Sequence, residues 1–222
     1  MAAWDLLVFD FDGVLVDSVD VKTKAFAALY GEHGRAVVDR VVAWHLAHGG
    51  VSRYEKFRHF HREFLGRPLG DEEASQLADR FSDLVEEAVI AAPWLPGARE
   101  FLEGHGGRFP LGVASGTPEE ELLRIMDRRG MRAYFSGVGG APRQKGEIIA
   151  SFLAAFSADP SRTLMIGDAG TDLEGARQAG VRFLGIAPAD ANPFPAGVPV
   201  LPDLSGLTGL LAGEALLVPS TR

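Results

Sequence analysis

Two carboxylates follow an apolar run near the start of the chain, in the stretch LLVFDFDGVLVDS at residues 6–18. Asp10 and Asp12 lie two positions apart, so both side chains face the same side of an extended segment. Like charges that lie this close repel, and each carboxylate beside an apolar sheet loses water that stabilised it. A bound cation would offset that cost, so the pair predicts a metal site.

A second group of residues suits an anion. The sequence SGT at residues 115–117 is followed by Pro118, which predicts that Thr117 caps a helix whose first residue is the proline. A hydroxyl such as that of Ser115, beside the free N–H groups of a helix N-terminus, forms an anion site. Lys145, at the start of KGEIIASFLAAF, adds a cation that can reach the same crevice.

Two more acids, Asp168 and Asp172, bracket a turn of small residues in the sequence GDAGTD at residues 167–172. Mg²⁺ prefers hard oxygen ligands and keeps several waters, so two or three protein oxygens and a substrate phosphate suffice to hold it. A pocket with one lysine, a few backbone N–H groups and a divalent ion can bind phosphate whatever the net charge of the protein. These residue types therefore fit a site that binds a divalent cation together with a phosphate.

The elements that must position these residues alternate along much of the chain. Short apolar runs typical of strands occur at residues 6–10, 110–116, 134–140, 163–168 and 182–187, with helical patterns between the later ones. This alternation predicts an α/β fold with a doubly wound parallel sheet and helices on both faces. Ligands of such sheets bind outside the carboxyl ends of the strands, where the acids and Ser115 lie.

The stretch after the first strand breaks the alternation. It contains no convincing strand and reads as four helices, at residues 20–34, 36–50, 52–66 and 71–92, with Ser52 and Glu55 forming a capping box. We predict an all-helical cap domain at residues 18–92, inserted into a core domain made of residues 1–17 and 93–222. The sequence PWLPG at residues 93–97 suits a hinge between the two.

Composition narrows the range of partners. The formal charge is −8 and no basic block occurs, which argues against nucleic acid or an anionic membrane as the main partner. The chain has no cysteine, and no apolar run approaches the roughly 20 residues of a membrane span. Because no basic leader precedes the first strand, we expect a cytoplasmic protein. Nothing in the sequence predicts the oligomeric state.

In order and approximate spacing, the motifs over nearly the whole chain resemble the haloacid dehalogenase (HAD) superfamily. The similarity is greatest to its phosphoglycolate phosphatase and β-phosphoglucomutase group, which carries a helical cap after the first strand. The resemblance implies a Rossmann-like core, Mg²⁺ as cofactor, and hydrolysis of a small phosphorylated metabolite through an aspartyl-phosphate intermediate. Asp10 would then be the nucleophile, and Asp12 the general acid and base. Because Asp12 must protonate the leaving oxygen, we expect its pKa to lie above that of Asp10.

The resemblance also implies the binding residues. The transferring phosphoryl group would be held by Ser115, Gly116 and Lys145. Mg²⁺ would be bound by Asp10, the backbone carbonyl of Asp12 and Asp168, with Asp172 supporting the metal or Lys145.

The predicted cap contributes one candidate for substrate recognition. The sequence HGGVSRYEKF at residues 48–57 resembles the cap loop of β-phosphoglucomutases, whose arginine touches the substrate, so Arg53 is expected to do so here. Lys22 and Lys24, on the first cap helix close to the DFDG loop, could also reach a substrate, but we expect them to be solvated surface lysines. The cap histidines fit no standard metal-binding spacing, and we expect them to pack or lie at the surface. These residues are His45, His48, His59 and His61.

Two other functions stay open at this point. A phosphosugar mutase would return the phosphoryl group to a sugar, but Lys22 stands where β-phosphoglucomutases carry a histidine. A separate departure from the family concerns the loop at Lys145: many members have a proline after this lysine, where the present chain has Gly146, and the geometry of the loop depends on it. A non-catalytic module that binds a phosphorylated ligand is the third possibility, against which the intact set of acids argues.

Overall fold

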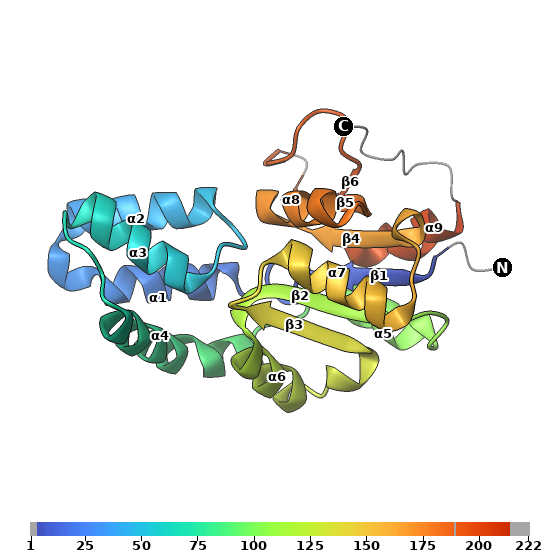
Figure 1. Ribbon diagram of the computed structural model, residues 1–222, viewed down its shortest axis with the longest axis horizontal. Coiled ribbons are helices and arrows are strands. Elements are labelled where there is room, and N and C mark those ends of the chain that lie inside the picture. Colours follow the sequence, from blue (N-terminus) through green and yellow to red (C-terminus); the bar gives the residue numbers. More distant parts are fainter. Residues whose placement is uncertain (1–3, 189, 214–222) are drawn as a thin grey trace.

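The computed structural model describes residues 4–188 and 190–213. Within them, a parallel six-stranded sheet lies between two layers of helices (Figure 1). Every neighbouring pair of strands is parallel, in the order β3-β2-β1-β4-β5-β6. The strands are β1 (Leu6–Phe9), β2 (Leu111–Pro118), β3 (Gly137–Ala141), β4 (Thr163–Gly167), β5 (Arg182–Ile186) and β6 (Val200–Leu201). The predicted α/β doubly wound fold is confirmed.

The central strand β1 shows why helices cover both faces of the sheet. Its four side chains are fully buried and alternate between two hydrophobic cores. Leu7 and Phe9 belong to the core that includes side chains of α5 (Ala98–His105), α6 (Glu119–Arg128) and α9 (Leu207–Ala212). Leu6 and Val8 belong to the core beneath α7 (Lys145–Phe156) and α8 (Gly170–Ala179).

The register of the sheet aligns the residues that were predicted to do chemistry. Phe9 lies opposite Val113 of β2 and Ile166 of β4. The backbone N–H of Asp10 continues this pairing by donating to the carbonyl of Ile166 at 2.9 Å. Asp10, Ser115 and Asp168 follow these three positions by one or two residues, so they lie together toward the carboxyl ends of the strands.

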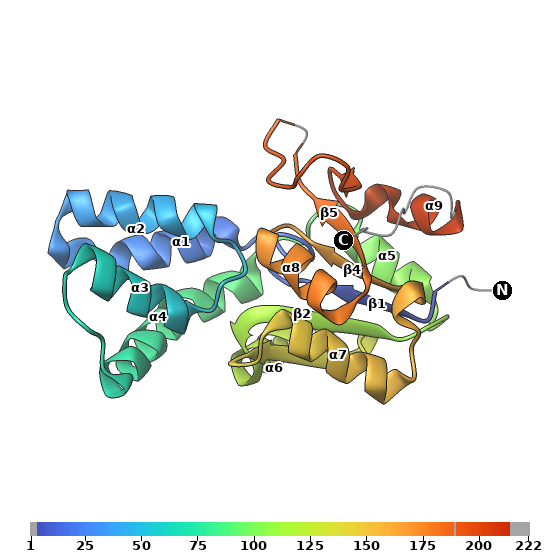
Figure 2. The same ribbon diagram turned by 45° about the horizontal axis from the view of Figure 1, so that its top comes forward.

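Four helices gather at one end of the molecule, beside that edge of the sheet (Figures 1 and 2). They are α1 (Val19–Leu29), α2 (Arg35–Ala47), α3 (Arg53–Phe64) and α4 (Asp71–Ala91). Their shared core includes Phe26, Phe57, Phe60 and Phe81, all at most 2% exposed. The predicted helical insert after the first strand is confirmed, while the division into residues 1–17 with 93–222 and residues 18–92 stays a prediction.

Two expectations at element ends differ from the structure. Helix α6 begins at Glu119, so Thr117 is not its N-cap. The reason is that Pro118 has an extended backbone (ψ 134°), which keeps Thr117 inside β2. Short β6 was not predicted, because two residues give no alternation to detect. Among the helices of the described residues, none is long and apolar enough to cross a membrane.

Candidate active site

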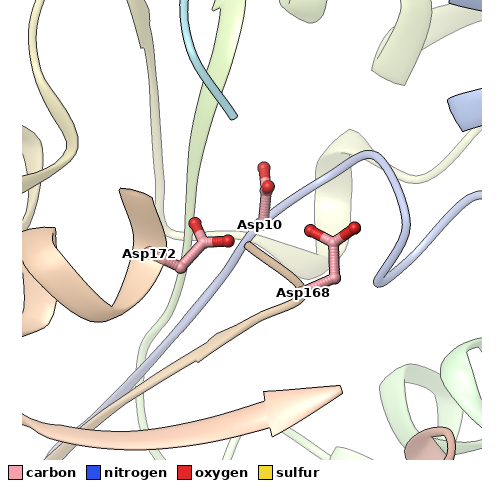
Figure 3. A group of neighbouring side chains, drawn as sticks. All are labelled: Asp10, Asp168 and Asp172. Carbon is pink, nitrogen blue, oxygen red and sulfur yellow. The ribbon is translucent and has the colours of Figure 1, made fainter. Parts of the chain in front are cut away.

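Three carboxylates meet at the carboxyl edge of the sheet (Figure 3). Asp10 follows β1, Asp168 follows β4, and Asp172 lies in the first turn of α8. Each offers an oxygen, and these three oxygens all lie within 4.8 Å of one another. The side chains turn toward a common space, as Figure 3 shows.

Lys145, the first residue of α7, links two of these acids. Its ammonium donates to Asp10 Oδ2 at 2.7 Å and also pairs with Asp172 Oδ1. Burial disfavours the charge on Lys145, but the two carboxylates outweigh it and hold its pKa above the usual value. Asp172 Oδ2 accepts the N–H of Ala169 at 3.0 Å, so both oxygens of this acid are engaged by the protein.

The positive charge that the protein supplies near Asp10 and Asp168 does not compensate for the burial of these two carboxylates. Burial is the main reason that the pKa of Asp10 is raised to about 7, since it outweighs the effect of Lys145. Burial also raises the pKa of Asp168 well above its usual value, and Asp10 and Asp172 add to the effect. Among the described residues, no side chain or backbone N–H donates to Asp168. A hard divalent cation such as Mg²⁺ fits this set of oxygens.

Gly13 lets the chain after Asp12 pass close to the acid cluster. Its φ is +79°, a conformation that residues with a side chain rarely adopt. A Cβ at this position would collide with the carboxylate of Asp168. The glycine of the DFDG motif is therefore needed for the approach of this loop to Asp168.

Asp12 lies in a different electrostatic environment from Asp10. Its carboxylate accepts hydrogen bonds from Ser18 Oγ at 2.5 Å and Thr117 Oγ1 at 3.2 Å, and it forms an ion pair with Lys22. Burial acts to raise the pKa of Asp12, but Lys22 and the hydroxyls outweigh it, so the net pKa is lowered. The expectation that the pKa of Asp12 lies above that of Asp10 is thus wrong for the metal-free protein.

The same contacts correct the expectation for one of the two lysines. The side chain of Lys22 is only 15% exposed and also donates to Thr117 Oγ1 at 2.8 Å, so it is not a solvated surface lysine. Lys24 is 76% exposed and pairs with Asp20 one turn earlier, as a surface lysine would. The sequence signal that indicates a role for Lys22 is its position four residues, about one helical turn, after Ser18, the residue that precedes α1.

Ser115 and Gly116 lie at the end of β2, close to the cap. Ser115 is buried, and its Oγ accepts the N–H of Thr117 at 3.1 Å. It lines a cavity of about 110 Å³ together with Lys145 and Gly116. A Cβ at Gly116 would come close to the carbonyl oxygen of Gly50 in the cap, so glycine permits this approach of cap and core.

A larger cavity of about 280 Å³ lies between the sheet edge and the cap. From the sheet side its walls include Asp10, Asp12, Gly116 and Asp168. From the cap side they include Lys22, His45, Arg53 and Lys56. The structure thus brings most of the predicted site residues to one cavity, to which the cap contributes basic side chains.

Arg53 is buried in the wall of this cavity but already has partners. Its two terminal nitrogens donate to the carboxylate of Glu121 in α6 at 2.9 and 2.6 Å, and one of them also donates to Ser82 Oγ at 2.7 Å. The guanidinium charge is therefore balanced by a carboxylate of the core. Contact between Arg53 and a substrate stays a prediction.

Two further cap residues in the cavity wall were not singled out as site residues. Lys56 Nζ lies 2.7 Å from His45 Nδ1, and both residues are buried. His45 packs against the ring of Phe26, in keeping with the packing role expected of it. For Lys56, the available signal was its place three residues after Arg53, which puts both on one face of α3.

Comparison with known proteins shows the family to which this chain belongs and supports the fold. Residues 4–180 match the model of the haloacid dehalogenase-like hydrolase family, and the chain therefore belongs to that family. A phosphoglycolate phosphatase of Caulobacter vibrioides is 32% identical over 192 residues, covering 79% of this chain and 76% of the relative. The prediction of an enzyme of the HAD phosphatase type is confirmed.

Solved structures show the same fold at lower identity. A β-phosphoglucomutase of Clostridium difficile is 18% identical, with a TM-score of 0.77 over 95% of this chain and 96% of that one. CbbY of Rhodobacter sphaeroides, in complex with xylulose-(1,5)bisphosphate, is also 18% identical, with a TM-score of 0.72 over 92% and 96%. These likenesses support the architecture of sheet and cap.

Proposed function

We propose that this protein is a Mg²⁺-dependent phosphomonoester hydrolase that acts on a small phosphorylated metabolite through an aspartyl-phosphate at Asp10. The observation that carries the proposal is the position of Asp10. Its carboxylate is buried in the cavity wall, pairs with Lys145, and lies beside Asp168, with Asp12 two residues further on. A nucleophile, a proton carrier and cationic support thus adjoin one cavity.

In the first step, a carboxylate oxygen of Asp10 forms a bond to phosphorus while the bond from phosphorus to the leaving oxygen breaks. Asp12 donates its proton to that oxygen, and the alcohol departs. In the second step, Asp12 takes a proton from water, the water oxygen attacks phosphorus, and the bond to Asp10 breaks. Inorganic phosphate leaves, and both carboxyl groups return to their initial state.

The remaining predicted residues bind and orient. Lys145, the hydroxyl of Ser115 and the backbone N–H of Gly116 would hold the phosphoryl oxygens. Asp10, Asp168 and the backbone carbonyl of Asp12 would hold Mg²⁺, while Asp172 fixes Lys145 through their ion pair. When bound, Mg²⁺ supplies positive charge that offsets the charge on Asp10 and on the phosphoryl oxygens.

The size of the cavity and the relatives favour a small substrate. About 280 Å³ is below the usual range for drug-sized ligands, roughly 300–1,000 Å³, and suits a compact metabolite. The Caulobacter relative is a phosphoglycolate phosphatase, and the CbbY structure contains a sugar bisphosphate. We therefore propose that the substrate is a small phosphorylated metabolite. A cytoplasmic location stays a prediction.

Phosphate release from a panel of phosphoglycolate, sugar phosphates, nucleotides and phospho-amino acids tests the proposal. We expect release that requires Mg²⁺, stops with a chelator, and is lost in an Asp10→Asn variant. Isomerisation of a phosphosugar in the presence of a bisphosphate, without net phosphate release, would instead indicate a mutase. Binding of phosphorylated ligands without either reaction would indicate a non-catalytic module.

A further inference from the structure

Lys56 is a buried cation in the wall of the large cavity, on the cap side. Lys56 is 3% exposed, and its ammonium lies 5.5 Å from the centre of the Phe26 ring. Lysines are rarely buried to this extent unless a partner balances their charge. Within the described residues, the ammonium interacts with the imidazole of His45 and with the ring of Phe26, and neither group carries a negative charge.

The other cations around the cavity are already paired with acids. Lys22 pairs with Asp12, Arg53 pairs with Glu121, and Lys145 pairs with two carboxylates of the acid cluster. Within residues 4–188 and 190–213, no carboxylate forms an ion pair with Lys56. Lys56 thus differs from its neighbours in having a charge that the protein leaves unbalanced.

The ammonium of Lys56 also has donors to spare. It carries three N–H groups, and within the described residues its single hydrogen bond is to His45 Nδ1 at 2.7 Å. Because an ammonium can only donate, Nδ1 of His45 must accept, which requires a neutral imidazole. Burial, with Lys56 and Lys22 adding to it, lowers the pKa of His45 to about 3, so the ring is neutral near pH 7.

The electrostatics around Lys56 favour an anion next to its ammonium. Burial lowers the pKa of Lys56 to about 7, and repulsion from Lys22 adds to the effect. An anionic oxygen next to the ammonium would reverse this shift by favouring the charged form. Lys56 is therefore poised to gain charge stabilisation from a ligand rather than from the protein.

We propose that Lys56 is a specificity-determining residue that binds a second anionic group of the substrate, a carboxylate or a second phosphate. This inference rests on the proposed function: the phosphoryl group would lie at Asp10, and the second anion would reach the cap wall of the same cavity. His45 is a positioning residue that directs the ammonium. The substrate class is then a short phosphate ester carrying an additional acid group.

Three esters with matched carbon chains test this inference: 2-phosphoglycolate, ethylene glycol bisphosphate and 2-hydroxyethyl phosphate, which lacks the second anion. We expect kcat/KM of the wild type to be highest for one of the two esters with a second anion, which identifies the anion. In Lys56→Gln, kcat/KM for that ester should fall about 10- to 100-fold more than kcat/KM for 2-hydroxyethyl phosphate. This is the range expected for a hydrogen bond to a charged group.

Two controls separate recognition from general damage. Lys24→Gln removes an exposed lysine of the same cap and should change the ratio of kcat/KM values less than about twofold. His45→Gln keeps a hydrogen-bond acceptor and should retain the preference for the ester with a second anionic group, whereas His45→Leu should lose this preference. An equal loss for all three esters in Lys56→Gln would overturn the inference, as would a wild type without any preference.

A binding measurement keeps this inference separate from the proposed function. In the Asp10→Asn background, calorimetry should show tighter binding of the preferred anionic ester than of 2-hydroxyethyl phosphate, and Lys56→Gln should remove the difference. If the wild type releases phosphate neither from these esters nor from the panel above, the proposed function fails, while this binding difference still supports the role of Lys56. Equal affinities for all three esters would overturn that role whatever the turnover.

Discussion

Single residues of the site show how the surroundings give neighbouring carboxyl groups different properties. Burial raises the pKa of Asp10 to about 7, whereas Lys22, Ser18 and Thr117 together keep the pKa of Asp12 below its usual value. A metal ion beside Asp10 would favour its charged form and so lower its pKa. The ion pair with Lys22 likewise favours the charged form of Asp12. A nucleophile needs the charged form, whereas a proton donor needs the protonated form that Lys22 disfavours.

Replacing Lys22 with methionine should shift the pH dependence of the reaction. A proton donor is active below its pKa, so activity falls as pH rises through the pKa of Asp12. Lys22→Met removes the charge that lowers this pKa. The falling limb of the plot of kcat/KM against pH for an alkyl phosphate should therefore move to higher pH.

The matched control for this change is Lys24→Met, two residues further along α1 on an exposed side chain. It should leave the limb where it is in the wild type. A limb that stays in place or moves to lower pH in Lys22→Met would show that Lys22 does not govern the proton of Asp12.

At the scale of helices, an ion pair joins cap and core. Arg53 of α3 binds Glu121 of α6, and both side chains are 4% exposed. Removing one partner of a buried pair leaves an uncompensated charge, which typically costs about 3–5 kcal/mol. Glu121→Gln should therefore lower the free energy of unfolding in urea by roughly that amount.

Another pair between helices provides the control. Arg124 of α6 binds Glu86 of α4 with an arginine side chain that is 54% exposed. Exposed pairs contribute about 0–1 kcal/mol, so Arg124→Gln should change the free energy of unfolding by no more than that. If Glu121→Gln were as stable as Arg124→Gln, the buried pair would not hold the cap and core together.

For the molecule as a whole, the acid cluster should make stability depend on Mg²⁺ and pH. In the metal-free protein the pKa of Asp10 rises from 3.8 to about 7 on folding. The stability that this shift contributes is complete below about pH 3.8 and is lost as pH rises through about 7. Ionised carboxylates bind the metal, so Mg²⁺ should raise the melting temperature more at pH 8 than at pH 5.

Thermal unfolding with Mg²⁺ or with a chelator, at both pH values, measures this difference. In Asp168→Asn the increase in melting temperature on adding Mg²⁺ should be much smaller, because the variant loses a charged oxygen of the cluster. An equal Mg²⁺ effect at both pH values, or an unchanged effect in Asp168→Asn, would contradict the assignment of the metal to this cluster.

The sequence allowed the fold to be predicted because its signals are local. The strand runs, the helical insert and the motifs at strand ends each show in a few consecutive residues. The partners of Arg53 and Asp12 could not be predicted, since Glu121 and Thr117 lie 68 and 105 residues away along the chain. Lys22 and Lys56 look like surface lysines in sequence, because their burial results from how the cap packs over the sheet.

Detection of a phosphoryl group on Asp10 tests the central claim most directly. The protein would be mixed with Mg²⁺ and a substrate found in the panel, quenched in acid within one turnover, and digested for mass spectrometry. We predict phosphorylation of the peptide containing Asp10 in the wild type and no phosphorylation in Asp10→Asn. In Asp12→Asn, the phosphorylated peptide should accumulate when the substrate is an aryl phosphate with a good leaving group. Phosphate release with no phosphorylated peptide, or a phosphoryl group on another residue, would contradict the account.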